Sequence, residues 1–430
     1  MDKKTNVLVF PCGAENALEI HTALKDVLNI ELFGASGKED HGRFVFKNYI
    51  GNVPYINAPD FLKFLNNLIK EFKIDIIFPT HDDVVLKLVE NSMNINAEIA
   101  VPGIDQAKVC RSKKMTYALF KDYDFCPVMF MDANQINSFP VFAKPNEGQG
   151  GKGAMVIKEN QKDIIYDLIK KDYVISEYLP GDEITVDCFS DKNGELRFVG
   201  PRERNRIFGG ISVNSKTIDL TDEINDIALC IHEKLIMNGL WFFQLKKNKQ
   251  GSYKLLEISL RVSVTMNLYR NLGINFPLLT IYNKLGYEVK IIKNNYTLEV
   301  DRALFNRYDT KIEYNTIYID FDDTITKNGK LNPSVIMFLY HCLNRQKTIK
   351  LITRHTQNIR KTLNQLCISP NIFNEIILLQ QDEKKYQYIK ERKGVIFIDN
   401  AFAERIEVQE ELNIPVFDVD AIMSLIDWRE

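Results

Sequence analysis

Hydrophobic and polar residues follow one repeating pattern over the first hundred positions. A short run of hydrophobic residues is followed by a polar turn and then by a longer stretch in which hydrophobic residues recur every three or four positions. The short runs are typical of buried strands and the longer stretches of amphipathic helices. Residues 6–10, 30–36 and 74–79 are predicted as strands, and residues 17–28 and 61–72 as helices. This alternation predicts a parallel sheet with helices on its faces.

Polar turns follow two of these strands. Residues 11–16 read PCGAEN and residues 79–83 read PTHDD, the latter with His81, Asp82 and Asp83. Ligands of parallel sheets gather beyond the carboxyl ends of the strands, so both turns are candidate ligand-binding loops. The same residues are equally typical of ordinary loop tips and helix caps.

The pattern changes at about residue 113 and again at residue 316. Between residues 139 and 200, strand-like segments follow one another with only turns between them, which predicts antiparallel hairpins. After residue 316 strands again alternate with helices, at residues 317–321, 349–353, 375–379 and 395–400. A length of 430 residues predicts two or three domains. We predict an α/β protein with domains at residues 1–110, 111–295 and 314–430 and a charged, irregular linker at residues 296–313.

Composition excludes several classes of function. A net charge of −2 gives no strong field to attract a nucleic acid or a membrane surface, so we expect neither partner. The seven cysteines show no CxxC spacing, which is typical of reduced thiols. The N-terminus opens directly with a predicted strand, and no hydrophobic run approaches membrane-spanning length. We therefore expect a soluble cytoplasmic protein of undetermined oligomeric state.

A glycine-rich loop joins two predicted strands in the segment FAKPNEGQGGKGAMVIK. It contains Gly148, Gly150, Gly151, Lys152 and Gly153. Glycine lets backbone N–H groups crowd against an anion. Because the loop is followed by a strand and not by a helix, it is predicted to be a hairpin flap over phosphates and not a P-loop. An ordinary hairpin tip has the same composition.

Charged residues cluster around this loop in the predicted structure. Lys144 ends the strand before it, and the segment SEYLPGDEITVDCF supplies Glu177, Glu183 and Asp187 around a Pro-Gly turn. Residues 241–261 are predicted to form a further hairpin.

If the turn of that hairpin centres between Gln250 and Gly251, Gln244 lies opposite Glu257. Ser259 and Arg261 then share the same face. Such a face could hold Mg²⁺ and a phosphate or carboxylate. A polar face exposed to solvent is the alternative.

In order along roughly the first 300 residues, these motifs resemble the ATP-grasp superfamily, most closely its carbamoyl-phosphate-synthase-like and carboxylate–amine ligase members. The resemblance makes residues 1–110 a pre-ATP-grasp substrate domain and residues 111–295 the nucleotide-binding domain. It implies that Lys113 and Lys144 contact the nucleotide and that Glu183 approaches the ribose. It assigns the phosphate flap to Gly150, Gly151, Lys152 and Gly153, and the adenine hinge to Glu177, Tyr178 and Leu179.

The same resemblance implies how the reaction is catalysed. Either Arg202 or Arg204 would reach the reacting phosphate, with Arg261 beside it. Gln244 and Glu257 would bind Mg²⁺ together with Ser259, which replaces the asparagine usual in the family. The implied activity is ATP-dependent ligation of a small carboxylate to an amine through an acyl phosphate. A kinase that phosphorylates a hydroxyl or amide group is the alternative.

The C-terminal block carries a second candidate site. In YIDFDDTIT, strand alternation predicts Asp320 and Asp322 on one face, with Thr324 in the following turn. Thr353 and Asp399 end later strands, and Lys385 is predicted to begin a helix. Two adjacent carboxylates favour phosphate chemistry with Mg²⁺. These side chains are expected to meet at one edge of a parallel sheet.

This order resembles the haloacid dehalogenase (HAD) superfamily from about residue 314 to residue 430. The resemblance implies an uncapped, HAD-like Rossmannoid phosphatase in which Asp320 is the nucleophile and Asp322 the acid and base. Thr353 and Lys385 would hold the phosphoryl group, and Asp320, Asp322 and Asp399 the Mg²⁺.

Several alternatives remain open for this block. Lys384 is the alternative to Lys385, although the spacing to Tyr388 and Ile389 favours the latter. Asn400 replaces a second acidic residue common in the family, for which Glu404 could compensate. His355 is interpreted as a surface or supporting residue. The whole sequence predicts a bifunctional enzyme that also acts on a phosphorylated metabolite, and a non-catalytic, regulatory HAD-like module is the alternative.

Overall fold

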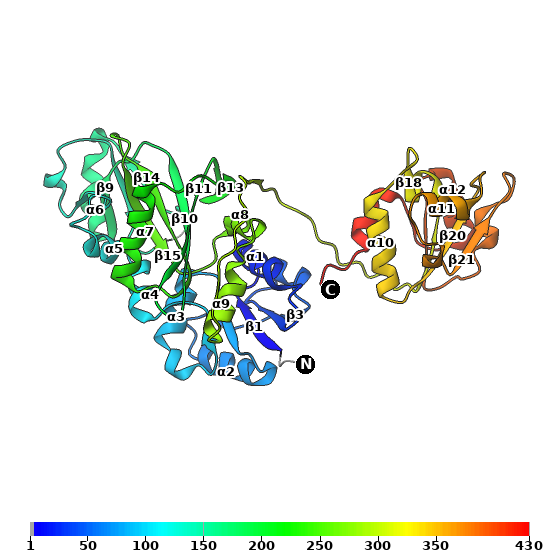
Figure 1. Ribbon diagram of the computed structural model, residues 1–430, viewed down its shortest axis with the longest axis horizontal. Helices are drawn as coiled ribbons and strands as arrows, with labels where there is room; N and C mark the ends of the chain where they lie inside the picture. The colour runs from blue at the N-terminus through cyan, green and yellow to red at the C-terminus, as the bar shows by residue number, and fades with distance from the viewer. Residues whose placement is uncertain (1–3, 149, 430) are drawn as a thin grey trace. The chain divides into compact units, whose positions relative to one another are not determined.

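The computed structural model describes residues 4–148 and 150–429, which form two compact units, Met1–Leu304 and Phe305–Glu430 (Figure 1). In the described residues, no helix is both long enough and apolar enough to cross a bilayer. All seven cysteines are free thiols.

The first unit begins with a parallel sheet of five strands in the order β3-β2-β1-β4-β5. Its strands are β1 (Thr5–Phe10), β2 (Ile30–Ala35), β3 (Asn48–Ile50), β4 (Ile76–Pro79) and β5 (Glu98–Ile99). Its helices are α1 (Glu15–Leu24), α2 (Phe61–Phe72) and α3 (Asp82–Glu90). The parallel sheet predicted from the sequence is thus confirmed. Helix α1 ends four residues earlier than predicted because a turn to Val27 leads the chain directly into β2.

Two antiparallel sheets follow, as the hairpin pattern predicts. One has the order β6-β9-β7-β8 and the other β11-β10-β14-β15. The first contains β6 (Met129–Phe130), β7 (Val141–Pro145), β8 (Met155–Ile157) and β9 (Tyr173–Glu177). The second contains β10 (Glu183–Ser190), β11 (Leu196–Glu203), β14 (Gly239–Lys247) and β15 (Tyr253–Ser259). Around them lie α4 (Ile104–Arg111), α5 (Lys113–Leu119), α6 (Ile165–Lys170), α7 (Asp222–Leu235), α8 (Asn267–Asn271) and α9 (Phe276–Lys284).

A third, smaller sheet joins β12 (Arg206–Phe208), β13 (Ile211–Lys216) and β16 (Glu299–Asp301) in antiparallel pairs. Strand β16 lies inside the range that the sequence predicts as a linker. It is held there by backbone pairing with β13 and by an ion pair between Asp301 and Arg206.

The parallel sheet packs against the β11-β10-β14-β15 sheet in shared hydrophobic clusters, whereas the β6-β9-β7-β8 sheet has a separate cluster that includes Val141 and Ile175. Leu8 and Ile77 of the parallel sheet belong to the same buried cluster as Val186 and Phe243 of the antiparallel sheet. The segments predicted as domains 1–110 and 111–295 therefore pack together as a single compact unit.

In the β14–β15 hairpin Gln244 lies opposite Glu257, as predicted. The register that leads to this pair differs from the predicted one. Near the turn, Lys247 pairs with Tyr253, one residue off the predicted register. An irregularity between Gln244 and Leu245 then shifts the pairing, so that Gln244 lies opposite Glu257. A bulge of this kind redirects side chains by one position.

The second unit is a parallel sheet of five strands in the order β21-β20-β17-β22-β23. Its strands are β17 (Thr316–Ile319), β20 (Thr348–Thr353), β21 (Glu375–Leu378), β22 (Val395–Ile398) and β23 (Val416–Phe417). Its helices are α10 (Pro333–Asn344), α11 (Ile359–Gln365) and α12 (Phe402–Leu412), and β18 (Thr326–Lys327) pairs with β19 (Lys330–Leu331). Numbered along the chain within this sheet, the strand order is 3-2-1-4-5, and the order reverses between β17 and β22, where the carboxyl ends of the two strands lie side by side.

Two local expectations for this unit are wrong. Strand β17 ends at Ile319, so Asp320 and Asp322 do not alternate along a strand; residues Phe321–Ile325 form a turn closed by a hydrogen bond from the Thr326 amide to the Phe321 carbonyl, in which Asp322 and Asp323 have non-helical backbone angles, with φ +55° at Asp323. Lys385 does not begin a helix but a single 3₁₀ turn, Lys385–Tyr388. The connection from β21 to β22 is instead held by side chains, among them Tyr388, which is hydrogen-bonded to Glu383.

Candidate active sites

The first candidate site is a pocket between the two antiparallel sheets of the first unit. Most of the residues predicted to contact a nucleotide or its Mg²⁺ line it: Lys113, Lys144, Gly150, Gly151, Lys152, Glu177, Tyr178, Leu179, Glu183, Gln244 and Glu257. Gly153 lies in the same loop but does not line the pocket. Phe142, Leu179 and Leu256 supply apolar surface, and the lysines and the glycine loop supply a polar region. A pocket with both surfaces suits a flat base joined to a chain of phosphates.

Two lysines place buried positive charge in this pocket. The Lys144 Nζ donates hydrogen bonds to Tyr117 Oη at 2.8 Å and to the Leu256 carbonyl at 2.9 Å. Burial lowers the pKa of Lys144 to about 7, against the attraction of Glu257. Burial also lowers the pKa of Lys113, whose Nζ lies 3.3 Å from the Asn146 carbonyl. An anion bound here would stabilise both ammonium groups.

The glycine loop lies against a second glycine turn, which the sequence alone did not associate with it. Gly150, Gly151 and Gly153 all have positive φ, as do Gly209 and Gly210 in the β12–β13 turn. A Cβ on Gly210 would lie 2.2 Å from the carbonyl oxygen of Gly150. The two turns can approach this closely only because position 210 has no side chain.

The predicted metal ligands divide into two groups. Gln244 and Glu257 face each other across β14 and β15 and line the pocket. Ser259 differs from expectation: its hydroxyl donates to Asp82 Oδ1 at 2.9 Å and does not line the pocket. No group of three or more His, Cys, Asp or Glu side chains in the described part of the chain is arranged to bind a metal. A cation held by Gln244 and Glu257 therefore needs further ligands, which nucleotide phosphates would supply.

The two arginines predicted as alternatives for the phosphate differ in their surroundings. Arg202 is 1% exposed and makes a bidentate ion pair with Asp187, with N–O distances of 2.6 and 3.0 Å. It also donates to Ser263 and Thr265, so most of its N–H groups are occupied. Arg204 lines the pocket and contacts Glu183 at 3.2 Å and the Gly210 carbonyl at 3.0 Å. Of the two alternatives, Arg204 is thus the better placed to meet a phosphate.

A second pocket adjoins the first and shares Gly150, Lys152, Arg204, Gly210, Gln244 and Glu257 with it. Arg261 lines this second pocket and its Nε lies 3.2 Å from Asp82 Oδ1. Although burial opposes ionisation, Arg261 and Ser259 hold the pKa of Asp82 below its ordinary value. A small molecule in this pocket would lie directly beside the phosphate end of the first.

The two candidate turns of the first sheet also border the second pocket. Ala14, Glu15 and Asn16 from the first turn and Thr80 and His81 from the second line it. Burial and the neighbouring Arg261 lower the pKa of His81. The strand pattern predicted that these turns lie beyond β1 and β4. It did not predict that they line one pocket together with residues of β14 and β15.

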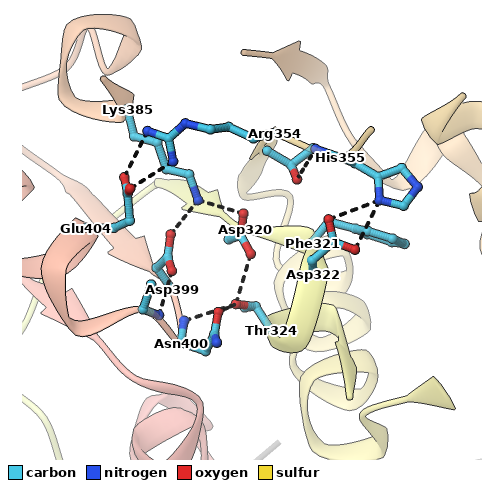
Figure 2. Close-up of polar contacts among 12 residues, drawn as sticks. Asp320, Phe321, Asp322, Thr324, Arg354, His355, Lys385, Asp399, Asn400 and Glu404 are labelled. Atoms are coloured by element: carbon cyan, nitrogen blue, oxygen red, sulfur yellow. Dashed lines mark hydrogen bonds and ion pairs between the residues drawn. The ribbon is translucent and has the colours of Figure 1, made fainter. Parts of the chain in front are cut away.

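The second unit contains a separate buried charge cluster at the carboxyl ends of β17 and β22. The Lys385 Nζ lies 2.6 Å from Asp320 Oδ1 and 2.6 Å from Asp399 Oδ2. Figure 2 shows the lysine extending between the two carboxylates. Lys385 is 4% exposed, whereas Lys384 is 51% exposed and pairs with Glu407. The structure thus places Lys385, and not Lys384, in the site.

Burial and charge shift the ionisation of this cluster. Burial raises the pKa of Asp320 to about 6, with Lys385 opposing the shift and Asp399 adding to it. Burial also raises the pKa of Asp399. Burial disfavours the Lys385 ammonium, yet the two carboxylates raise its pKa above the ordinary value. Such perturbed groups at the edge of a parallel sheet are candidates for catalysis.

Hydrogen bonds from neighbouring groups hold the Asp320 and Asp399 carboxylates in place. Thr324 Oγ1 lies 3.3 Å from Asp320 Oδ2 and accepts a hydrogen bond from the Asn400 amide at 3.0 Å. The Ala401 amide donates to Asp399 Oδ1 at 2.8 Å. Asn400 thus supports the turn and contacts Thr324, in the position where the sequence expected a further acid (Figure 2).

Asp322 lies apart from this cluster and is 55% exposed. Its carboxylate contacts His355 Nδ1, and Thr353 Oγ1 accepts a hydrogen bond from the His355 amide at 3.2 Å. Asp320 and Asp322 therefore do not share a face as predicted. The turn that begins at Phe321 directs Asp320 to Lys385 and Asp322 to His355. Glu404 is bonded to Arg354 at 2.8 Å and is not free to compensate for Asn400.

Comparison with known proteins concerns the first unit. Residues 170–303 match the family described as "ATP-grasp in the biosynthetic pathway with Ter operon". The chain also resembles a biotin carboxylase from Campylobacter jejuni in a complex with β,γ-ATP, with a TM-score of 0.57 and 15% identity over 69% of this chain and 74% of that one. The first unit has the ATP-grasp fold.

Two ligases share this ATP-grasp fold. An N5-carboxyaminoimidazole synthetase from Staphylococcus aureus, solved with ADP, superposes with a TM-score of 0.55 and 16% identity over 66% of this chain and 78% of that chain. An L-amino acid ligase from Bacillus licheniformis gives a TM-score of 0.52 and 15% identity over 66% and 75%. No protein with a curated description matches the sequence. The matched ATP-grasp family ends at residue 303, before the second unit.

Proposed function

We propose that the protein is a bifunctional enzyme. Its ATP-grasp unit joins a small carboxylate to an amine through an acyl phosphate, and its second unit is a HAD-like phosphatase. The observation that carries the ligase assignment is the pair of adjoining pockets that share Lys152, Arg204, Gln244 and Glu257. A nucleotide in one pocket and a carboxylate in the other would meet at these residues. The cofactors are ATP and Mg²⁺, and the expected location is the cytoplasm.

In the ligase unit the residues divide by task. Lys113, Lys144 and the amides of the glycine loop would bind the phosphates, and Glu177, Tyr178 and Leu179 the adenine end, with Glu183 beside the ribose. Mg²⁺ held by Gln244 and Glu257 would neutralise charge on the transferring phosphoryl group. Arg204 and Arg261 would orient the substrate carboxylate. Positive groups held in advance at this point stabilise the developing charge.

Formation of an acyl phosphate distinguishes this ligase from a kinase. The purified protein is incubated with MgATP, hydroxylamine and a panel of carboxylates, including amino acids and dicarboxylates. Hydroxylamine attacks an activated acyl group and leaves a hydroxamate, which is detected by mass spectrometry together with ADP. We expect hydroxamate with at least one carboxylate. ADP release with a phosphorylated hydroxyl compound and no hydroxamate would instead establish a kinase.

The phosphatase assignment rests on the buried trio Asp320, Lys385 and Asp399 at the edge of a parallel sheet. The carboxylates of Asp320 and Asp399 suit a hard cation. The Lys385 ammonium group already neutralises part of their negative charge. Mg²⁺ bound there would offset the negative charge of an incoming phosphate ester. Asp320 would attack phosphorus, while Lys385 and Thr353 hold the phosphoryl oxygens. Asp322 would protonate the leaving oxygen and then take a proton from the attacking water.

Hydrolysis of generic phosphomonoesters tests this second activity. The full-length protein with Mg²⁺ is expected to release phosphate from an aryl or alkyl phosphate, and Asp320→Asn to abolish it, because an amide is a poor nucleophile. In a single turnover in heavy-oxygen water, the label is expected in the released phosphate and not in Asp320. Phosphate release that persists in Asp320→Asn would exclude an aspartyl-phosphate mechanism.

A further inference from the structure

The His355 side chain is held at both ends of its ring. Its Nδ1 lies 3.0 Å from each carboxylate oxygen of Asp322, and its Nε2 lies 3.0 Å from Thr362 Oγ1. The ring also meets Phe321 edge to face, with centroids 5.1 Å apart. Figure 2 shows the imidazole directed at the Asp322 carboxylate. His355 is 12% exposed, although its partner is mostly exposed.

The chemistry of the contact with Asp322 fixes its direction. An ionised carboxylate only accepts hydrogen bonds, so Nδ1 carries a proton and donates it to Asp322. Thr362 lies in the first turn of α11, where its Oγ1 also contacts the Asn358 carbonyl at 3.2 Å. The helix start thus anchors the far side of the ring. Because Nδ1 approaches both oxygens of Asp322, either oxygen can hold the contact while the other carries a proton.

An exposed aspartate without such a partner would sample several rotamers. A catalytic acid must reach the leaving oxygen within hydrogen-bonding distance, so lost orientation lowers the rate. The backbone amide of His355 donates to Thr353, which is proposed to hold the phosphoryl group. One residue therefore connects the proposed phosphate-binding side chain with the proposed acid.

We propose that His355 is a positioning residue that orients the Asp322 carboxyl group for proton transfer to the leaving group. This inference rests on the proposed phosphatase function. In the first step an Asp320 oxygen forms a bond to phosphorus as the ester P–O bond breaks, the electron pair of the broken bond goes to the leaving oxygen, and the proton of Asp322 moves to that oxygen. In the second step a water oxygen forms a bond to phosphorus, the bond between phosphorus and Asp320 breaks with its electron pair returning to the Asp320 carboxylate, and the water gives a proton to Asp322. His355 keeps its proton throughout, so the cycle balances without it.

Leaving groups of different basicity separate positioning from a structural role. The full-length protein and its variants are assayed with Mg²⁺ on p-nitrophenyl phosphate, whose leaving group needs little protonation, and on glycerol 2-phosphate, whose leaving group needs it. His355→Ala is expected to lower kcat on the alkyl ester by about tenfold or more, within the 10²–10⁴-fold that an acid contributes. On the aryl ester the loss is expected to stay below about threefold.

Two further variants make the test specific. In His355→Asn the side-chain amide can replace the Nδ1 donor, so the alkyl-ester rate is expected to recover most of its wild-type value. His341→Asn changes a histidine on α10 outside the site and is expected to leave both rates unchanged. In an Asp322→Asn background, His355→Ala is expected to cost nothing further, because the group it positions is gone.

Three results would overturn the inference while leaving the phosphatase assignment intact. These are equal losses on both esters, an Asn variant as slow as the Ala variant, and an additive loss in the Asp322→Asn background. If the wild-type protein hydrolyses neither ester, the proposed phosphatase function fails and this inference fails with it. Thermal unfolding of each variant shows whether a loss of rate reflects loss of the fold.

Discussion

Adjacent lysines in the second unit offer a matched comparison at the scale of single residues. Lys385 lies between two buried carboxylates, and Lys384 lies on the surface with Glu407. Lys385→Ala leaves Asp320 and Asp399 facing each other without a cation, which also raises the pKa of Asp320 further. We expect phosphatase activity to fall by at least about 100-fold in Lys385→Ala and to stay near wild type in Lys384→Ala. Equal effects in the two variants would contradict the placement of Lys385.

Lys144 predicts a proton uptake when the nucleotide binds. With a pKa of about 7 in the free protein, its side chain is mostly neutral at pH 8. Phosphates beside it favour the ammonium and raise the pKa, so binding takes up about one proton at pH 8 and fewer at pH 6. Calorimetry of MgATP binding in two buffers of different ionisation enthalpy measures this number.

The control for this measurement is Lys144→Met, which keeps the length of the side chain and removes its charge. We expect it to abolish the proton uptake and ATP-dependent turnover, the latter by two or more orders of magnitude. An unchanged uptake would assign the proton to another group.

Long-range contacts explain which site residues the sequence could not place. Lys144, Gln244 and Glu257 follow from motif order and strand register, and they line the predicted pocket. Ser259 shares a strand face with Glu257, but its hydroxyl is taken by Asp82, a residue 177 positions away. No local pattern encodes that partner. Strand alternation alone therefore placed the Ser259 side chain without its main partner.

At the scale of elements, the contact between two glycine turns gives a further prediction. Gly209 and Gly210 both have positive φ, so alanine at either position strains the backbone. Only at Gly210 does the added Cβ meet another atom, the Gly150 carbonyl oxygen. Gly210→Ala should therefore push the glycine loop away and weaken ATP binding by about tenfold, and Gly209→Ala should lower stability alone. ATP affinity and thermal unfolding are measured on both variants.

Elements were predicted where a periodic pattern spans several residues. Helix α2 has the predicted bounds, and the central strands of both parallel sheets lie where short hydrophobic runs placed them. The short strands β3, β5 and β23, of two or three residues each, were not predicted, because so few residues carry no periodic pattern. The predicted helix at Lys385 does not form because the 16 residues between β21 and β22 are held by single side-chain contacts and not by helical periodicity. The turn after β17 failed for a related reason: a strand pattern continues through Asp320, but the backbone turns at Phe321 to carry Thr324 beneath the site.

At the scale of the whole molecule, each unit contains a candidate site built from its own residues. The proposed nucleotide and carboxylate pockets are lined by residues of the first unit only. The charge cluster of Asp320, Lys385 and Asp399 belongs to the second, which has its own hydrophobic cores. Because the two sites lie in units with separate hydrophobic cores, a substitution in one site is expected to leave the activity of the other unchanged.

Independent failure of the two activities follows from this division. Glu257→Ala removes a proposed ligand of Mg²⁺ in the first unit and should abolish ATP-dependent hydroxamate formation, while phosphate release from p-nitrophenyl phosphate stays within about twofold of wild type. Asp320→Asn should do the opposite, because it changes only the nucleophile of the second unit. Both assays are run on each full-length variant and on the double variant, in which both activities should be lost. If either single variant loses both activities while its unfolding temperature is unchanged, the two reactions share a site or are obligatorily coupled. In that case the interpretation of one chain with two independent phosphate chemistries is wrong.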